Sequence, residues 1–255
     1  MRTAGRRGRT EPRLVAVCAG YALRACFPTK RRIGLALPAA GALLFALLAR
    51  LIPDTAPAAL AQVADGGLFG IVLPVGCLVI GDAVLGAEVR SGTLHFTWLS
   101  PVSFGTVVAG RWLAGSAVAV AALAVPFGVA AVVVGVPAAV GPLFLAAGVG
   151  SAAYVAVFVL IGALSRRAVV WSLAFVVLGE RLLGTALSGL AQWCPGWEAR
   201  AVYARLGPGA AGTLHRAGIP EGGSAVVRLV LIAAVALVVA ALRLGRLRLS
   251  GPSGD

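Results

Sequence analysis

The stretch WLAGSAVAVAALAVPFGVAAVVVGVPAAVGPLFLAAGVGSAAYVAVFVLIGALS, residues 112–165, contains no charged side chain. A helix needs about 20 apolar residues to cross the hydrocarbon core of a bilayer, so this stretch is too long for a single crossing. Gly135-Val136-Pro137 and Gly141-Pro142 mark a turn inside it. The stretch therefore predicts two membrane spans joined as a tight hairpin.

The rest of the chain has the same character, since 60% of all residues are hydrophobic and only 12% are charged. Soluble domains are about 45–50% apolar and about 25% charged. We therefore expect an all-α, polytopic membrane protein with six transmembrane helices. Their predicted ranges are about 33–52, 66–85, 112–135, 143–164, 168–187 and 225–242. The first range resembles a signal peptide because Ala59-Leu60-Ala61 follows it, but its apolar run is longer than the usual segment of about 7–15 residues.

The N-terminal region, residues 1–32, predicts a basic tail followed by a helix that lies in the membrane interface. Thr10-Glu11-Pro12 is typical of a helix start. After it, apolar and basic residues follow helical spacing on different faces, as in interfacial amphipathic helices; an ordinary packed helix is the alternative. The apolar positions are Leu14, Val17, Cys18, Tyr21 and Ala25, and the other face holds Arg13, Gly20 and Arg24. Lys30-Arg31-Arg32 is expected to end this region, before a single transmembrane domain at 33–250 and a tail at 251–255.

Positive charge predicts the orientation of the chain. With the N-terminus in the cytoplasm, 16 of the 22 Lys and Arg residues fall on the cytoplasmic side, whereas the expected outer loop at 53–65 has none and carries Asp54 and Asp65. The positive-inside rule therefore predicts that both termini are cytoplasmic. The net charge of +13 then faces the anionic inner leaflet, so the expected partner is the lipid bilayer and not nucleic acid.

Several chemistries lack their usual residues. The one lysine, Lys30, is followed by Arg31, so the Gly-Lys-Ser/Thr of a P-loop is absent. The four cysteines form no CxxC pair and the two histidines are far apart in sequence, which argues against a zinc site of that spacing. We expect no catalytic residues, no metal and no cofactor in this chain, and no enzymatic activity of the chain by itself.

The segment 88–103 predicts a short helix outside the bilayer, between the second and third spans. Ser91 or Thr93 can cap it, and Ser100-Pro101 ends it. Leu94 and Trp98 lie one turn apart and form an apolar stripe. Such a helix suits a groove on a soluble partner, and Ser103 can cap the following span.

This segment resembles the signature of ABC-2-type permeases, the membrane subunits of bacterial ABC exporters. The order Glu-x-x-x-Gly-Thr-Leu, then Ser-Pro-Val-Ser, then Gly-Arg reads here as Glu88, Gly92, Thr93 and Leu94, then Ser100–Ser103, then Gly110-Arg111. The motif covers about 25 residues, whereas the predicted architecture agrees with that of the family over nearly the whole chain. The chain departs from the family where Phe96, Thr97 and Trp98 replace the usual bulky aliphatic pair.

The resemblance implies a function and its partners. The 88–103 segment would be the coupling helix of a permease that moves substrate across the bacterial cytoplasmic membrane, while ATP and Mg²⁺ bind a separate ABC ATP-binding subunit. A second permease subunit would complete a homodimer or heterodimer. The expected partner-binding residues are Glu88, Arg90, Gly92, Thr93, Leu94, Trp98 and Pro101. Glu88 and Arg90 could instead be solvated charges at a helix end.

Glu180 and Arg181 interrupt the predicted fifth span. They lie 13 and 14 residues after Arg167, or about 20 Å from the cytoplasmic boundary at 1.5 Å per residue. A charge at mid-membrane costs about 2.5–3.5 kcal/mol. The pair therefore lines a translocation pathway or dimer seam, or it sits in an outer vestibule if the span is short.

An outer loop is expected at about 188–224, and it contains Trp193-Cys194-Pro195-Gly196-Trp197. The tryptophans are typical of interface anchors, and a re-entrant hairpin is the alternative. Because Cys194 is the only cysteine in an expected outer segment, no disulfide within the chain is predicted; a bridge between two copies stays open. The alternatives to the permease are a secondary transporter, a membrane-embedded enzyme, and a non-transporting scaffold or immunity protein.

Overall fold

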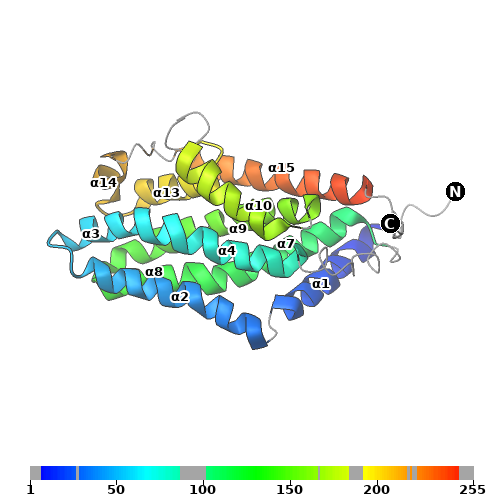
Figure 1. Ribbon diagram of the computed structural model, residues 1–255, viewed down its shortest axis with the longest axis horizontal. Coiled ribbons are helices and arrows are strands. Elements are labelled where there is room, and N and C mark those ends of the chain that lie inside the picture. Colours follow the sequence, from blue (N-terminus) through cyan, green and yellow to red (C-terminus); the bar gives the residue numbers. More distant parts are fainter. Residues whose placement is uncertain are drawn as a thin grey trace.

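A computed structural model describes residues 7–26, 29–86, 102–165, 167–183, 192–216, 219 and 223–246. Within these residues every regular element is a helix, and the helices form an elongated bundle (Figure 1). The α-helices are α1 (Arg7–Cys26), α2 (Thr29–Ala49), α3 (Ala56–Val63), α4 (Leu73–Gly81), α7 (Phe104–Ala119), α8 (Val125–Val134), α9 (Val140–Leu164), α10 (Ala168–Ala174), α13 (Pro195–Leu206), α14 (Ala210–Arg216) and α15 (Ala225–Arg246). Between them are π-helical segments η1 (Ala64–Val72), η2 (Asp82–Gly86), η3 (Val120–Ala124) and η5 (Phe175–Leu183), and a 3-10 turn, η4 (Pro137–Ala139).

Four continuous helical stretches among the described residues are long and apolar enough to cross a membrane: Ala56–Leu85, Phe104–Val134, Pro137–Leu164 and Ala225–Gly245. They correspond to four of the six predicted spans, so the all-α class is confirmed and four of the predicted spans contain helices long and apolar enough to cross a membrane. Within the other two predicted spans, the described apolar helices are Ala36–Ala49 and Ala168–Glu180.

Several predicted boundaries are wrong. Helix α1 begins at Arg7 rather than after Thr10, and Lys30-Arg31-Arg32 lies inside α2 instead of ending the preceding region. Much of the expected 53–65 loop is helical, because α3 starts at Ala56 with a proline in its first turn, where a missing N–H costs nothing. Two helices, α13 and α14, occupy most of the described part of the expected outer loop.

Two membrane-spanning stretches widen into π-helix immediately before a proline. Segment η1 precedes Pro74, and η3 precedes Pro126, and each proline stands in the first turn of the next α-helix. A proline inside a helix lacks a hydrogen-bond donor and clashes with the carbonyl four residues earlier. The wider π-helical turn before each proline accommodates the missing hydrogen bond and the steric clash. Each helical stretch therefore continues across its proline.

The predicted hairpin in the uncharged stretch is confirmed. Helix α8 ends at Val134, and Gly135 adopts the left-handed conformation with φ of 91°, which glycine reaches without steric cost. The chain then turns through η4 into α9. The hairpin therefore places α8 and α9 side by side and antiparallel.

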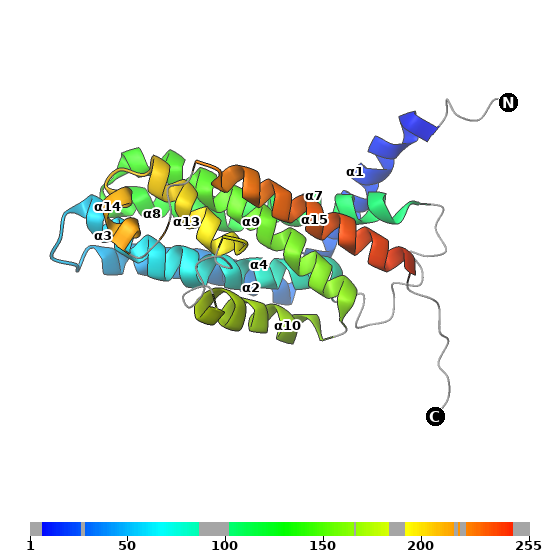
Figure 2. The same cartoon turned by 90° about the horizontal axis from the view of Figure 1, so that it is seen from above.

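Helix α9 lies at the centre of the bundle (Figures 1 and 2), where it packs against α4, α7, α8, α13 and α15. One end of the bundle, here named the terminal end, holds α1, the start of α7 and the end of α15; the opposite, distal end holds α3, α14 and the α8–α9 hairpin. Small residues permit the close packing. At Gly150 a Cβ atom would come within 2.7 Å of the Cβ of Ala199 on α13.

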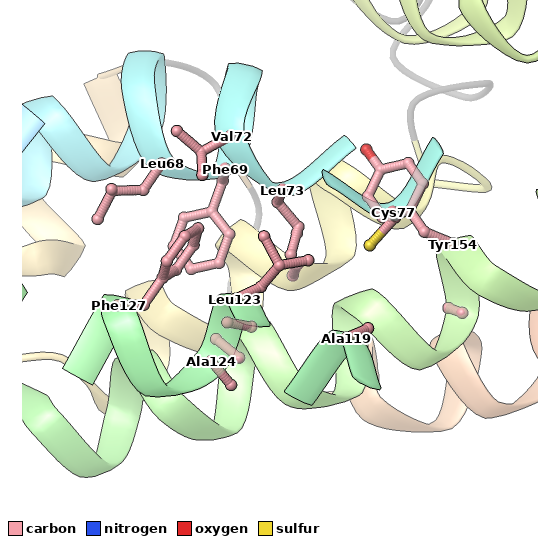
Figure 3. Packing of buried hydrophobic residues seen from close by; sticks show 14 of the residues in the cluster. Leu68, Phe69, Val72, Leu73, Cys77, Ala119, Leu123, Ala124, Phe127 and Tyr154 are labelled. Atoms are coloured by element: carbon pink, nitrogen blue, oxygen red, sulfur yellow. The ribbon is translucent and has the colours of Figure 1, made fainter. Parts of the chain in front are cut away.

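Aromatic rings fill the core toward the distal end. The Phe69 ring meets the Phe127 ring edge to face at a centroid distance of 5.6 Å and tilts against Tyr203 at 5.8 Å. Figure 3 shows Phe69 and Phe127 between the α3–α4 stretch and the α7–α8 stretch, together with the neighbouring Leu68 and Leu73. Since Tyr203 belongs to α13, this aromatic cluster joins α13 to two of the membrane-spanning stretches.

Candidate functional site

The coupling segment expected from the sequence lies almost wholly outside the described residues, which stop at Gly86 and resume at Val102. None of the seven expected partner-binding residues is therefore placed: Glu88, Arg90, Gly92, Thr93, Leu94, Trp98 and Pro101. The structure does describe the two helix ends from which this segment leaves and to which it returns. We call Val84, Ser103, Gly110 and Arg111 the base of the segment.

Ser103 caps α7, as predicted. Its backbone is extended, with φ of −66° and ψ of 142°, and its Oγ accepts a hydrogen bond of 3.2 Å from the backbone N–H of Thr106. The two side-chain oxygens of Ser103 and Thr106 are also 2.7 Å apart. An N-cap of this kind contributes about 1 kcal/mol. It defines the residue at which the chain re-enters the helical bundle.

Arg111 holds the other end of the segment. It lies on α7, is 4% exposed, and donates from Nη1 to the carbonyl oxygen of Val84 at 2.9 Å. Val84 belongs to η2, two residues before Gly86, where the described part of this helical segment stops. A hydrogen bond from a charged donor of this kind is stronger than one between neutral groups. Arg111 thus ties the exit of the segment to the helix that receives it.

Gly110 brings the N-terminal helix to the same place. A Cβ atom at Gly110 would come within 2.7 Å of the Cβ of Cys18 and within 2.9 Å of the carbonyl oxygen of Val15, both on α1. Helix α1 therefore packs directly on α7 beside the base of the segment. The exposed face of α1 includes Val17 and Tyr21, which are 69% and 62% exposed, so these two residues do not belong to the packed face.

The second polar site lies inside the bundle around Glu180. This carboxylate is 7% exposed. The hydroxyl of Tyr154 donates to its Oε2, and the backbone N–H of Gly196 donates to its Oε1 at 3.2 Å. Arg181 follows in the same π-helical segment, and its side chain lies outside the described residues.

The position of Tyr154 sets the depth of this site. Tyr154 lies 10 residues before the end of α9 at Leu164, which is about 15 Å along the helix at 1.5 Å per residue. This is about half of a hydrocarbon core of about 30 Å. Glu180 is therefore buried inside the bundle, about 15 Å along α9 from the end of that helix. Its surroundings are protein side chains and backbone.

Helix α13 starts at this depth and runs toward the distal end. It has 12 residues, or about 18 Å, so it spans roughly half the bundle. Its first turn leaves no spare room, because a Cβ atom at Gly196 would come within 2.5 Å of the Tyr154 hydroxyl and 2.9 Å of Glu180 Oε2. Only glycine lets the backbone approach this carboxylate so closely.

Two ion pairs hold α13 to its neighbours. Arg228 of α15 contacts Glu198 through Nη1 and Oε1 at 3.1 Å. Arg200 contacts Asp65 of η1 through Nε and Oδ1 at 3.1 Å. We call these four residues, with Tyr154, Glu180 and Gly196, the α13 cluster. The cluster joins a half-length helix to η5, α9, α15 and η1.

The Cys194 thiol lies just before the start of α13 and is 6% exposed. Its burial disfavours the bridge between two copies that the sequence left open.

Most of the α13 cluster is not predictable from the sequence. Glu180 is a candidate there but its partner Tyr154 is not, and Arg200 and Arg228 are two of the six basic residues outside the expected cytoplasmic side. One signal was visible, since Arg228 stands inside an otherwise apolar predicted span. A lone charge in such a run usually faces a protein interior. The packing of Trp197 against the core also differs from an interface anchor, whereas Trp193 is 58% exposed.

Within the residues described above, no group of three or more His, Cys, Asp or Glu side chains could hold a metal ion. Comparison with known protein families and with characterised proteins gives no match for this chain. A function is therefore proposed below from the motif between Glu88 and Arg111 and from the geometry of the two sites.

Proposed function

We propose that this protein is the transmembrane permease subunit of an ATP-binding cassette exporter of the bacterial cytoplasmic membrane. It would work as a homodimer or heterodimer with separate ATP-binding subunits. The observation that carries the proposal is the base of the segment. In the sequence, residues 87–101 connect η2 to α7, and Arg111 and Ser103 form hydrogen bonds at the described helical residues next to this segment.

This arrangement suits the transfer of motion from a soluble partner. A docking segment moves the membrane helices only if its ends are held stiffly to them. Arg111 connects the end of one membrane-spanning stretch to the next, and Gly110 lets α1 pack against the same turn. A push on residues 87–101 would therefore reach η2 and α7 together. The missing P-loop agrees with an energy source on another polypeptide.

The proposal includes a topology of six membrane spans. Four are the long apolar stretches, and the other two would be α2 and α10 with η5, whose described apolar parts are Ala36–Ala49 and Ala168–Glu180. The terminal end would face the cytoplasm, in accordance with the positive-inside rule. Helix α13 would then begin near mid-membrane and open toward the outer side. There the α13 cluster would couple movement of α15, η5 and η1.

A secondary transporter is the second candidate, because Glu180 is a buried carboxylate near mid-depth. Such a transporter would need this carboxylate to exchange protons or ions with water. In the described structure, Glu180 instead accepts hydrogen bonds from Tyr154 and from the first turn of α13. These contacts favour a role in positioning α13.

ATP hydrolysis in nanodiscs tests the proposal. The full chain is reconstituted with the ATP-binding protein encoded beside it, and the rate is compared with that of the ATP-binding protein alone. We expect stimulation that is lost when residues 92–99 are deleted and retained in Trp193→Ala, a control that removes an exposed tryptophan at the other polar segment. Stimulation that survives the deletion would contradict the coupling role, and transport driven by an ion gradient without ATP would favour the second candidate.

A further inference from the structure

An apolar groove of about 480 Å³ runs between α2 and the α3–α4 stretch. Its lining is apolar throughout, and α2 contributes Leu37, Gly41 and Leu44 while the facing stretch contributes Val72, Val75 and Val79. The volume is in the range of small-molecule sites, about 300–1,000 Å³. None of the lining side chains offers a donor or acceptor, so water in the groove would lose hydrogen bonds.

The sequence of α2 explains the groove. Gly34, Pro38 and Gly41 recur on one face of the helix and leave a furrow there. At the floor of the furrow the two helices are in close contact. A Cβ atom at Gly41 would come within 3.3 Å of Val72, and one at Gly34 would come within 3.4 Å of Val79. Its rims are open, since Leu37 is 66% and Leu44 is 57% exposed. The groove thus faces the surroundings of the bundle.

The length and depth of the groove match one leaflet of a bilayer. Its lining on α2 extends from Gly34 to Phe45, about 16 Å at 1.5 Å per residue, or about half of a 30 Å core. It starts one helical turn after the basic residues in the first turn of α2. The occupant therefore needs a long apolar part along the groove and a polar part at the terminal end of the bundle.

The basic residues at the start of α2 determine which polar headgroup suits the groove. Lys30, Arg31 and Arg32 belong to the first turn of α2, and Arg24, exposed in the last turn of α1, precedes them. Four basic residues therefore lie close together along the chain, at the end of α2 from which the groove starts. Each basic residue near a membrane surface contributes about 1 kcal/mol toward binding anionic lipid.

We propose that this groove binds one acyl chain of an anionic phospholipid, whose phosphate headgroup lies near the four basic residues at the start of the groove. The occupant is a lipid of the leaflet at the terminal end. The inference depends on the membrane location of the chain and is independent of the proposed transport function. A bound lipid would fill the furrow and support α2.

Photocrosslinking tests the proposal on the full chain in nanodiscs. Phosphatidylglycerol with a diazirine in one acyl chain is compared with the matching phosphatidylcholine probe, and adducts are mapped by mass spectrometry. We expect phosphatidylglycerol adducts on Gly34–Phe45 and Ile71–Val79, competed by unlabelled phosphatidylglycerol and several-fold weaker with phosphatidylcholine. Arg31→Gln should weaken the phosphatidylglycerol adducts about fivefold.

Two matched substitutions separate the groove from ordinary lipid contact. Val75→Phe should fill the groove and lower its labelling several-fold, whereas Val129→Phe, at a similarly exposed valine of α8 (39% and 44% exposed), should leave it unchanged. If Val75→Phe does not yield folded protein, Ala40→Phe fills the same groove from α2. Equal labelling by both lipids, labelling unaffected by the filling variant, or a Leu37→Cys crosslink showing a second copy in the groove would each overturn the proposal.

Discussion

Two buried glutamates stand at the start of α13, and the hydrogen bonds described for them come from different kinds of donor. The described hydrogen bonds to Glu180 come from two donors without charge, the Tyr154 hydroxyl and the Gly196 N–H, whereas Glu198 pairs with the cation Arg228. Both carboxylates benefit from the positive end of the α13 dipole. The difference lies in what happens when the carboxylate is removed.

When its carboxylate partner is removed, Arg228 can reorient toward a polar region, whereas the Tyr154 hydroxyl and the Gly196 N–H cannot. The Arg228 side chain is 34% exposed in its pair with Glu198, so its guanidinium can turn toward a polar region at the cost of a rotamer change. Tyr154 is fully buried, and Gly196 is backbone within a helix. A contact built on buried neutral donors is therefore expected to tolerate less change than an ion pair with a half-exposed partner.

Glu180→Ala should have the largest effect. It leaves the Tyr154 hydroxyl and the Gly196 N–H without their acceptor, and each unsatisfied donor costs about 1–3 kcal/mol. We expect a loss of about 3 kcal/mol in unfolding free energy, measured by denaturant titration of the protein in micelles. Glu180→Gln keeps an acceptor oxygen and should lose much less. Equal losses in the two variants would show that charge, not hydrogen bonding, holds this site.

Gly196→Ala should follow, because its methyl group would overlap the Tyr154 hydroxyl and Glu180 Oε2. Overpacking of this kind costs about 1–3 kcal/mol. The control is Gly212→Ala in α14, where an added Cβ meets nothing within 4 Å and alanine should stabilise the helix by about 0.5–1 kcal/mol. Thermal unfolding of the pair in nanodiscs should therefore shift in opposite directions; a shared downward shift would remove the steric explanation.

Glu198→Ala should cost about 1–2 kcal/mol, less than Glu180→Ala, because Arg228 can reorient. A double-mutant cycle with Arg228→Ala measures the coupling between the two side chains. We expect the double variant to lose less than the sum of the single losses. Strict additivity would mean that the contact between α13 and α15 does not depend on this pair.

Tyr154→Phe should show the smallest effect of the four, a loss of about 1 kcal/mol, since Glu180 keeps the Gly196 N–H. Tyr203→Phe is its matched control. The Tyr203 hydroxyl is buried and has no hydrogen-bond partner within the described part of the chain, so its removal should be neutral or stabilising. If both variants lose the same stability, the Tyr154 hydrogen bond contributes little.

Features that depend on neighbours in sequence could be predicted, and those that depend on distant pairs could not. The uncharged stretch, the turn at Gly135 and the cap at Ser103 follow from local rules, and the structure has all three. In contrast, Tyr154 and Glu180 are 26 residues apart, and Glu198 and Arg228 are 30 apart, so no periodicity links them.

Helix α13 escaped prediction for a related reason. Its first residues, Pro195 and Gly196, are typical of loops, yet here proline occupies the first helical turn and glycine provides the clearance that a buried carboxylate needs.

Crosslinking of the coupling segment tests the central proposal most directly. A benzophenone is attached to the chain at Trp98→Cys, after the native cysteines are replaced, and the complex with its ATP-binding subunit is irradiated with and without ATP. The permease proposal predicts an adduct between residue 98 and the ATP-binding subunit whose yield changes with ATP, and no adduct from the same label at Trp193→Cys. An adduct at residue 193 but not at residue 98, or none at either, would contradict it.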